Sequence, residues 1–388
     1  MRKLERFMLL LLTSFRLLCS AEIDLHHMTI YGDGKSYCAW PSITRLANGD
    51  LIVLFCESEE HLGPDGRILA MRSKDNGKSW QGPQVVYDTI IDDRECGLTA
   101  LRDGRLLVHL WSTQWTEKAY LNLAKNSYES SVLQRWITQV KQPDYLQAGH
   151  WQKAWLSISS DHGRTWSEPM DGPDSVHGGV QLADGSILVA GYRNHSSYCG
   201  VYKSDSTASA WQEIATVRSP QPDSFYFGEP HVAQLKSGRI IMMIRATETK
   251  YNDQGKKCFL WETWSDDGGK TWMKPYPIPL WGFPPHLLLL QDGRLLCTYG
   301  YRRAPFGQRA CLSDDGITWK LDDEIILRQD AINGDLGYPA SIELESGKIL
   351  TVYYQPDASE RKQRMRPPDP HRKKPAIQGT LWFIAKNR

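Results

Sequence analysis

Two glutamates and a tyrosine occupy corresponding places in this sequence, each nine residues before the glycine of a repeated turn. They are Glu95, Glu229 and Tyr338, and Arg94 lies directly before the first of them. Carboxylates and a phenol that face one water-filled cleft can perform general acid–base and nucleophilic catalysis, whereas an apolar core would not accept them unpaired. The common spacing therefore indicates a functional site, provided that the repeats surround one axis.

The turn that defines this spacing occurs six times. In each copy, a polar turn with a glycine precedes an apolar run of strand length that is rich in β-branched residues. The glycines are Gly49, Gly104, Gly185, Gly238, Gly293 and Gly347. Their separations of 55, 81, 53, 55 and 54 residues indicate an array of similar units with room for four short strands each. His177 and His286, eight and seven residues before their glycines, join the same ring.

A second motif, S-x-D-x-G-x-[ST]-W, interleaves with the first. It is complete at Ser73–Trp80, Ser159–Trp166 and Ser265–Trp272, one residue shorter at Ser313–Trp319, and reduced to its serine and tryptophan at Ser204–Trp211. The aspartate can accept backbone N–H bonds, the glycine supplies a positive φ, and the tryptophan ring can pack beneath the turn. These residues therefore indicate a structural hairpin turn rather than a reactive site.

These turns resemble the Asp-box, or BNR, repeats of the sialidase (neuraminidase) superfamily, and the resemblance covers almost all of the chain after residue 21. It implies an all-β fold, a six-bladed β-propeller formed by residues 22–388 as one domain. Six glycine turns agree with six blades. A propeller also explains how so many strands avoid exposed edges.

The resemblance also implies roles for individual residues. Phe227–His231, with the strand that follows it, resembles the family segment in which a glutamate assists the nucleophile and an arginine binds the substrate carboxylate. These roles fall to Glu229 and Arg245. Gly334–Pro339 resembles the segment of the nucleophilic tyrosine, which places that role at Tyr338. Tyr301–Arg309 resembles the region of another carboxylate-binding arginine, with Arg302 preferred over Arg303 and Arg309.

The sequence departs from the family pattern in the first repeat. Sialidases have Arg-Ile-Pro there, but this chain has Ala39-Trp-Pro41, so the first of the expected arginines is absent. Arg94 is the candidate to replace it. The general acid should lie between Glu57 and Asp65, where Asp65 is the nearest match and Glu59, Glu60 and His61 are the alternatives.

The resemblance favours a secreted exo-glycoside hydrolase that removes a terminal sialic acid or related acidic sugar from a glycan. A neutral tyrosine suits a substrate with its own carboxylate at the reacting carbon, because an anionic nucleophile would be repelled. Arg94, His61, Glu95, His177 and His286 are further candidates for substrate contact. Two alternatives remain open: a polysaccharide lyase acting on a uronate, and a carbohydrate-binding propeller without catalysis. Tyr338 and Arg245 could also be packing and ion-pair residues.

Composition and cysteine spacing argue against other classes. A net charge of +1 gives no reason to expect a nucleic-acid partner. The eight cysteines are scattered without a CxxC pair, so we expect no metal site, no cofactor, and buried free thiols more than disulfides.

A basic start, an apolar stretch and small residues at 19–21 predict a signal peptide over residues 1–21 and a secreted or periplasmic protein. No other segment is expected to span a membrane, and oligomeric state stays open.

Two segments interrupt the period. The longest interval implies an insertion at about 113–151, in which residues 120–142 have helical spacing and are expected to form a helix near the substrate cleft. The basic, proline-rich residues 359–374 are expected to form a solvated loop. Residues 379–385 should complete the last blade, paired with residues 23–31.

Overall fold

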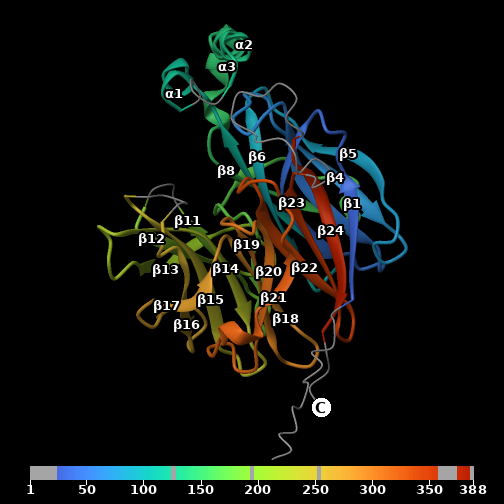
Figure 1. The fold of residues 1–388 in the computed structure, drawn as a ribbon, viewed down its shortest axis with the longest axis vertical. Helices are drawn as coiled ribbons and strands as arrows, with labels where there is room; N and C mark the ends of the chain where they lie inside the picture. The colour runs from blue at the N-terminus through green and yellow to red at the C-terminus, as the bar shows by residue number, and fades with distance from the viewer. Residues whose placement is uncertain (1–23, 124–127, 193–195, 251–254, 357–373, 385–388) are drawn as a thin grey trace, which may run out of the picture.

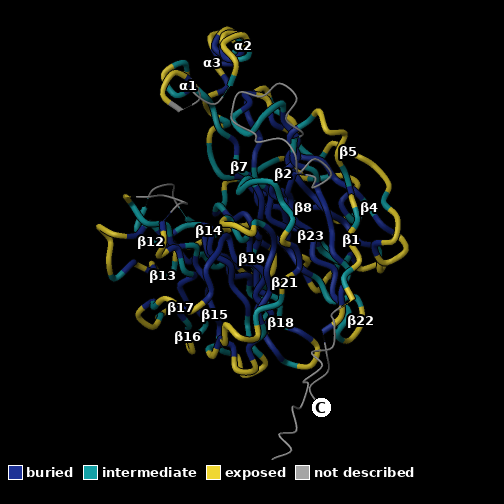
Figure 2. The backbone as a smooth tube through the Cα atoms, in the orientation of Figure 1, coloured by how far each residue is buried: buried dark blue, intermediate teal, exposed yellow. Residues whose placement is uncertain are grey.

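The computed structural model describes residues 24–123, 128–192, 196–250, 255–356 and 374–384. Their strands form six antiparallel sheets of four strands each, so the predicted six-bladed β-propeller is confirmed (Figure 1). The strands are mostly buried, whereas the turns that connect them are exposed (Figure 2). The inner strands of the blades therefore bring distant parts of the sequence to one central region.

Five blades are formed by consecutive strands, the innermost strand first. Blade 1 consists of β2 (Tyr37–Arg45), β3 (Leu51–Ser58), β4 (Arg67–Ser73) and β5 (Gln81–Tyr87). Blade 2 consists of β6 (Asp92–Ala100), β7 (Leu106–Thr113), β8 (Ala154–Ser159) and β9 (Met170–Asp171). Blade 3 consists of β10 (Val180–Gln181), β11 (Ile187–Tyr192), β12 (Tyr198–Ser204) and β13 (Gln212–Arg218). Blade 4 consists of β14 (Phe225–Gln234), β15 (Ile240–Glu248), β16 (Phe259–Ser265) and β17 (Tyr276–Trp281). Blade 5 consists of β18 (Pro285–Leu289), β19 (Leu295–Tyr301), β20 (Gly307–Ser313) and β21 (Ile325–Arg328), with a short helix η2 (Leu321–Asp323) before β21.

The sixth blade joins the two ends of the described chain. It consists of β22 (Gly337–Glu345), β23 (Lys348–Gln355), β24 (Ala376–Phe383) and the N-terminal strand β1 (Leu25–Tyr31). β1 pairs antiparallel with β24, so that His27 lies opposite Thr380. The predicted pairing of the chain ends is confirmed, and it closes the ring.

The glycine turns have the geometry that the sequence predicts. All six glycines have φ between 79° and 98°, a region that other residues rarely adopt. In the first Asp-box, the Asp75 carboxylate accepts a hydrogen bond from the Ser79 N–H at 2.8 Å, and the Ser73 hydroxyl accepts one from Gly77 at 2.8 Å. The repeated motifs are therefore structural turns.

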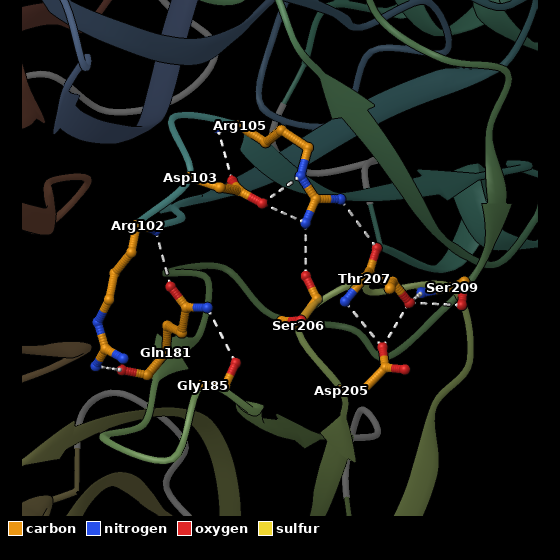
Figure 3. Close-up of polar contacts among 9 residues, drawn as sticks. All are labelled: Arg102, Asp103, Arg105, Gln181, Gly185, Asp205, Ser206, Thr207 and Ser209. Carbon is orange, nitrogen blue, oxygen red and sulfur yellow. Dashed lines mark hydrogen bonds and ion pairs between the residues drawn. The ribbon is translucent and has the colours of Figure 1, made fainter.

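The degenerate motif of blade 3 is held partly by its neighbour. Asp205 accepts hydrogen bonds from the backbone N–H and the hydroxyl of Thr207 within this turn. Arg105, from the turn of blade 2, donates to the carbonyl oxygens of Ser206 at 2.6 Å and Thr207 at 3.2 Å (Figure 3). Contacts between the blades thus stabilise a turn that lacks aspartate and glycine at the usual positions of the motif.

The insertion after β7 is helical and projects from the propeller (Figure 1). It comprises α1 (Glu117–Leu123), α2 (Ser130–Val140), α3 (Pro143–Gln147) and η1 (Ala148–Trp151). The single helix predicted over 120–142 is thus wrong in detail, since α1 and α2 divide that range. Tyr120, Trp136 and Tyr145 form the buried core of the insertion together with Ile91, which directly precedes β6 of blade 2. The insertion therefore has an apolar core of its own, attached to the propeller.

The seven cysteines in the described residues are all free and buried, which agrees with the expectation of buried thiols. Within the same residues, no helix has the length and apolar character needed to cross a membrane. No group of metal-ligating side chains was found there either. The predicted signal peptide and most of the predicted basic loop lie outside the described residues.

Glu262 links blades 4 and 5 and should make stability depend on pH. Its buried carboxylate accepts hydrogen bonds from Trp319 and Tyr276, both at 2.5 Å, yet burial raises its pKa to about 7. Because the folded-state pKa exceeds the unfolded value, this group stabilises the fold fully below about pH 4.5 and less as the pH rises through 7. Through this group, the free energy of unfolding of the wild-type protein should fall by roughly 2–3 kcal/mol between pH 4.5 and 8. This fall should be absent in Glu262→Gln, which mimics the protonated form. Urea unfolding of both proteins at the two pH values measures the difference; an equal pH dependence would contradict the assignment.

Candidate active site

Three innermost strands carry a strained residue at the same register position. Trp40, Glu229 and Tyr338 have φ values of 55°, 44° and 49°, although none is glycine. Each coincides with a register shift in the pairing between the first two strands of its blade. Such conformations cost roughly 1–3 kcal/mol each and are concentrated at functional sites. Glu95, at the same position of blade 2, also lies at a register shift.

Tyr338, Glu229 and Arg245 form a continuous hydrogen-bonded chain. The Tyr338 hydroxyl donates to one carboxylate oxygen of Glu229 at 2.5 Å, and Arg245 donates to the other at 2.6 Å. Tyr338 and Glu229 are buried, with 5% and 7% of their surface exposed. The predicted nucleophile, its glutamate and one predicted arginine therefore meet, although Glu229 and Tyr338 are 109 residues apart in sequence.

The surroundings of Tyr338 explain why it needs a base. Burial, together with the negative charges of Glu229 and Glu95, raises the pKa of Tyr338 well above its ordinary value, and Arg245 and Arg302 oppose this rise. The phenol is therefore neutral at physiological pH. A phenol of this kind becomes a nucleophile when a hydrogen-bonded base removes its proton as it attacks, and Glu229 is in position to do so.

The two predicted arginines, Arg245 and Arg302, both lie against the aromatic ring of Phe283. The guanidinium carbons of Arg245 and Arg302 lie 4.6 and 5.2 Å from the ring centroid of Phe283. Arg302 also lies 5.8 Å from the Tyr338 ring and donates to the carbonyl oxygen of Leu336 at 2.9 Å. The geometry places two cationic groups beside the phenol, where a substrate carboxylate could be held.

The alternatives to Arg302 have other contacts. Arg303 lies 4.2 Å from the ring centroid of Trp281. Arg309 is buried, with its guanidinium directed at backbone carbonyl groups and 4.4 Å from the Tyr301 ring centroid. Of the three candidates, Arg302 has the ring contact with Tyr338.

Arg94 lies beside Trp40, which follows Ala39, the position at which the sequence resemblance led us to expect an arginine. Its guanidinium carbon is 4.5 Å from the centroid of the Trp40 ring. It donates to Asp92 at 2.7 Å and to the carbonyl oxygen of His61 at 2.8 Å. The residue is only 9% exposed. Arg94 therefore joins the first two blades and the acid loop, and its direct contact with substrate stays a prediction.

The loop predicted to carry the general acid is fixed by contacts from distant segments. Glu59 accepts hydrogen bonds from Trp136 and Arg135 of the helical insertion. Glu60 pairs with Lys374 at 3.2 Å. The insertion thus lies against the acid loop, and its place near a substrate cleft stays a prediction.

His61 and Asp65 differ in their surroundings. The His61 ring nitrogen lies 2.6 Å from the Tyr37 hydroxyl and 3.5 Å from Asp335. Asp65 is exposed, and within the described residues its carboxylate has no side-chain hydrogen bond or ion pair. Partial desolvation and the negative charges of Glu59 and Asp92 raise its pKa above the ordinary value. Glu59 and Glu60 are held by the insertion and by Lys374, whereas Asp65 has a raised pKa and no ion pair with a described residue, as suits a proton donor. Its role as the general acid stays a prediction.

The carboxyl group of Glu95 lies close enough to Tyr338 and Glu229 to interact with both electrostatically. Glu95 accepts a hydrogen bond from Tyr192 at 3.1 Å. Burial and the charge of Glu229 raise the pKa of Glu95 to about 7, and the pKa of the neighbouring Asp174 is raised by burial and by both glutamates. These carboxyl groups can therefore be protonated while Glu229 is paired with Arg245.

His177 and His286 lie together near the axis. Their ring centroids are 5.7 Å apart, and His231 lies 4.5 Å from His286. Burial lowers the pKa of His177 well below its ordinary value and that of His286 to about 3. His177 is 6.3 Å from Tyr338 between ring centroids. Both residues are thus neutral neighbours of the site, and their contact with substrate stays a prediction.

The pKa of Glu95 predicts a pH effect on catalysis. As the pH rises through 7, ionised Glu95 places a second negative charge near Glu229 and an anionic substrate. We expect kcat/KM to decline above about pH 7 and this decline to be removed in Glu95→Gln. Initial rates at low substrate concentration between pH 5 and 9 measure it. Identical profiles for both proteins would contradict a role for this charge.

Sequence analysis missed Trp111 and Tyr192. Both lie seven residues after a repeat glycine, at the register position that Arg245 occupies in blade 4. This position lies in the last part of the second strand, where Trp111 pairs with Glu95 in blade 2 and Arg245 pairs with Gly228 in blade 4. The same counting applied forward from the glycines would have found them.

Comparisons with known proteins agree with this architecture. A family profile described as the BNR repeat-like domain matches residues 142–351. No curated protein matches the chain. Solved structures with a similar fold include a protein of unknown function from Dyadobacter fermentans, with 22% identity, a TM-score of 0.71, and coverage of 93% of this chain and 99% of that one.

Two solved sialidases are also similar in fold. The NanB sialidase of Streptococcus pneumoniae is 12% identical with a TM-score of 0.62, over 92% of this chain and 70% of that one. The intramolecular trans-sialidase of Ruminococcus gnavus is 14% identical with a TM-score of 0.58, over 92% and 96% of the two chains. At these identities the likeness shows the fold.

Proposed function

Because this chain belongs to the BNR repeat-like family and has a sialidase-type propeller, we propose that it is an exo-acting glycoside hydrolase for a terminal sialic acid or related acidic sugar. The observation that carries the proposal is the hydrogen-bonded chain of Tyr338, Glu229 and Arg245. It combines a neutral nucleophile, a base and a cation for an acidic substrate.

In the first step, the Tyr338 oxygen attacks the anomeric carbon while Glu229 takes the phenolic proton. The glycosidic C–O bond breaks, and Asp65 gives its proton to the leaving oxygen. Arg245 and Arg302 hold the substrate carboxylate. In the second step, Asp65 takes a proton from water, the water oxygen bonds to the anomeric carbon, and Tyr338 leaves and recovers its proton from Glu229.

Two features of blade 1 extend the proposal from sialic acid to related acidic sugars. Ala39 stands where the family has an arginine, and the Trp40 ring with Arg94 against it occupies the adjoining space. With two guanidinium groups in place of three, the site has fewer donors for a carboxylate and is less specific for the acidic group of sialic acid. This is why the proposal includes sugars related to sialic acid.

A pooled screen of acidic glycosides, with mass analysis of the products, tests the proposal. It predicts release of a free acidic monosaccharide from the chain terminus. An unsaturated product that absorbs in the ultraviolet would instead indicate a lyase. Glycans that bind but are never cleaved would indicate a binding propeller.

Asp65→Asn should reveal the general acid through its dependence on the leaving group. Loss of the proton donor should lower kcat by about 10²-fold for a glycan, whose leaving oxygen needs protonation. The same variant should retain nearly full activity on an aryl glycoside with an acidic phenol as leaving group. Glu60→Gln provides the control, since Glu60 pairs with Lys374. Equal losses on both substrates would contradict the assignment of Asp65.

A further inference from the structure

A cavity opens between blades 2 and 3, with Tyr192 in its lining. Its volume is about 580 Å³, within the ~300–1,000 Å³ typical of small-molecule sites. Two strands beside the boundary between these blades, β9 and β10, are short, with two residues each. A small apolar cluster that includes Leu107 and Val189 packs between the same blades. The two blades thus pack together over part of their length and leave a cleft over the rest.

Aromatic side chains dominate the cleft. Its lining includes Trp111, Tyr192, Tyr202 and Trp211. The Tyr202 ring lies against two glycines that face each other in the sheet, Gly191 and Gly200. A Cβ atom at these glycines would approach the ring to 3.1 and 2.8 Å, respectively. The missing side chains therefore allow the ring to lie along the sheet as part of the cleft wall.

The charges in the cleft favour a neutral ligand. Among the described lining residues there are three carboxyl groups, those of Asp171, Asp174 and Glu213, and no lysine or arginine. Asp171 pairs with Lys153 at 2.5 Å, and burial raises the pKa of Asp174 well above its ordinary value, so the cleft has little net charge. Its described lining includes no cation to hold an anion, and its carboxyl groups accept hydrogen bonds from hydroxyl groups. Aromatic faces pack against the C–H groups of a sugar ring, whose hydrogens are weakly positive. This combination fits a neutral pyranose.

Tyr192 separates the cleft from the catalytic residues. Its ring lines the cleft, while its hydroxyl donates to Glu95 at 3.1 Å. The ring also lies beside Gly228, where a Cβ atom would be 3.6 Å from it, and Gly228 directly precedes Glu229. A ligand in the cleft would thus be one side chain away from the reacting sugar.

We propose that this cleft binds a neutral sugar unit of the glycan that carries the terminal acidic sugar. The inference rests on the proposed function, because it places the acidic sugar at Tyr338 and Arg245 and the adjoining neutral unit beyond Tyr192. The cleft thereby selects the glycan chain, whereas the arginines select the terminal sugar.

Trp111→Ala tests the cleft with two substrates of the same acidic sugar. In sialyllactose the leaving group is a neutral disaccharide, whereas in sialyl fluoride it is a single ion. Loss of the aromatic wall should lower kcat/KM for sialyllactose roughly tenfold through a higher KM, and change that for the fluoride by less than about twofold. Glu213→Ala, at an exposed rim position, should lower only the sialyllactose value, by about threefold. Phe383→Ala, which removes an exposed ring on β24, is the control.

Direct binding separates this proposal from the proposed function. Lactose should shift NMR signals of the wild-type protein and shift them less in Trp111→Ala. If neither substrate is cleaved and the pooled screen also releases no acidic monosaccharide, but lactose still binds in this way, the hydrolase proposal fails and the cleft stands. Equal losses on both substrates, no loss on sialyllactose, or lactose binding that is absent or unaffected by the substitution would overturn the proposed cleft.

Discussion

Replacement of Tyr338 by phenylalanine should lower kcat by at least about 10³-fold while leaving the fold intact. The variant keeps the ring that packs beside Trp40 and His177, but it loses the oxygen that attacks the anomeric carbon. Substrate binding should change little, because Arg245 and Arg302 remain. Steady-state kinetics on a substrate that the wild type cleaves gives both kcat and KM.

Tyr353→Phe is the matched control for this substitution. Tyr353 lies on β23, next to the β22 strand of Tyr338, is also buried, and makes hydrogen bonds through its hydroxyl with Arg328 and Thr380 rather than with Glu229. Its variant should lose some stability and no activity. If Tyr338→Phe retained more than about a tenth of the wild-type kcat, Tyr338 could not be the nucleophile.

Glu229→Gln should lower kcat by roughly 10²–10⁴-fold, the usual range for loss of a general base. The amide keeps the shape of the side chain but cannot take the proton of Tyr338. It also leaves the guanidinium of Arg245 without its carboxylate, so KM for an acidic substrate should fall or stay constant rather than rise. The measurement is again kcat and KM, together with the thermal midpoint.

The chain offers a close structural control for Glu229. Glu57 accepts a hydrogen bond from Tyr31 at 2.7 Å and pairs with Arg67 at 2.7 Å, which repeats the tyrosine–glutamate–arginine arrangement between blades 6 and 1. Glu57→Gln should therefore affect stability and not activity. Similar kinetics for the two variants would mean that the arrangement around Glu229 is structural.

Sequence periodicity predicted the fold and the centre of the site for the same reason. In a propeller, equal distance from a repeat glycine means equal height along the axis, so residues nine positions before these glycines converge. Glu229 and Tyr338 meet as predicted. Their strained φ angles could not be predicted, because glutamate and tyrosine carry no sequence signal for that conformation.

Contacts between distant segments limited the prediction elsewhere. Arg94 was a candidate substrate ligand, but its partners Asp92 and the His61 carbonyl depend on how the acid loop folds over blade 2. The conformation of the loop in turn depends on its contact with Trp136 in the insertion. The insertion is not part of the repeat, so the spacing of the glycines does not predict its position. The spacing from the repeat glycines therefore predicts which residues of the repeat lie at the same height, whereas the positions of residues in insertions and loops come only from the structure.

Trapping of the covalent intermediate tests the central claim most directly. An acidic glycosyl fluoride with a second fluorine next to the reacting carbon should form the sugar–enzyme bond and release it slowly. After proteolysis, mass spectrometry should find the sugar on the peptide that contains Tyr338, and no adduct should form in Tyr338→Phe. An adduct on another residue, or turnover of the reagent without any adduct in the wild type, would contradict the account.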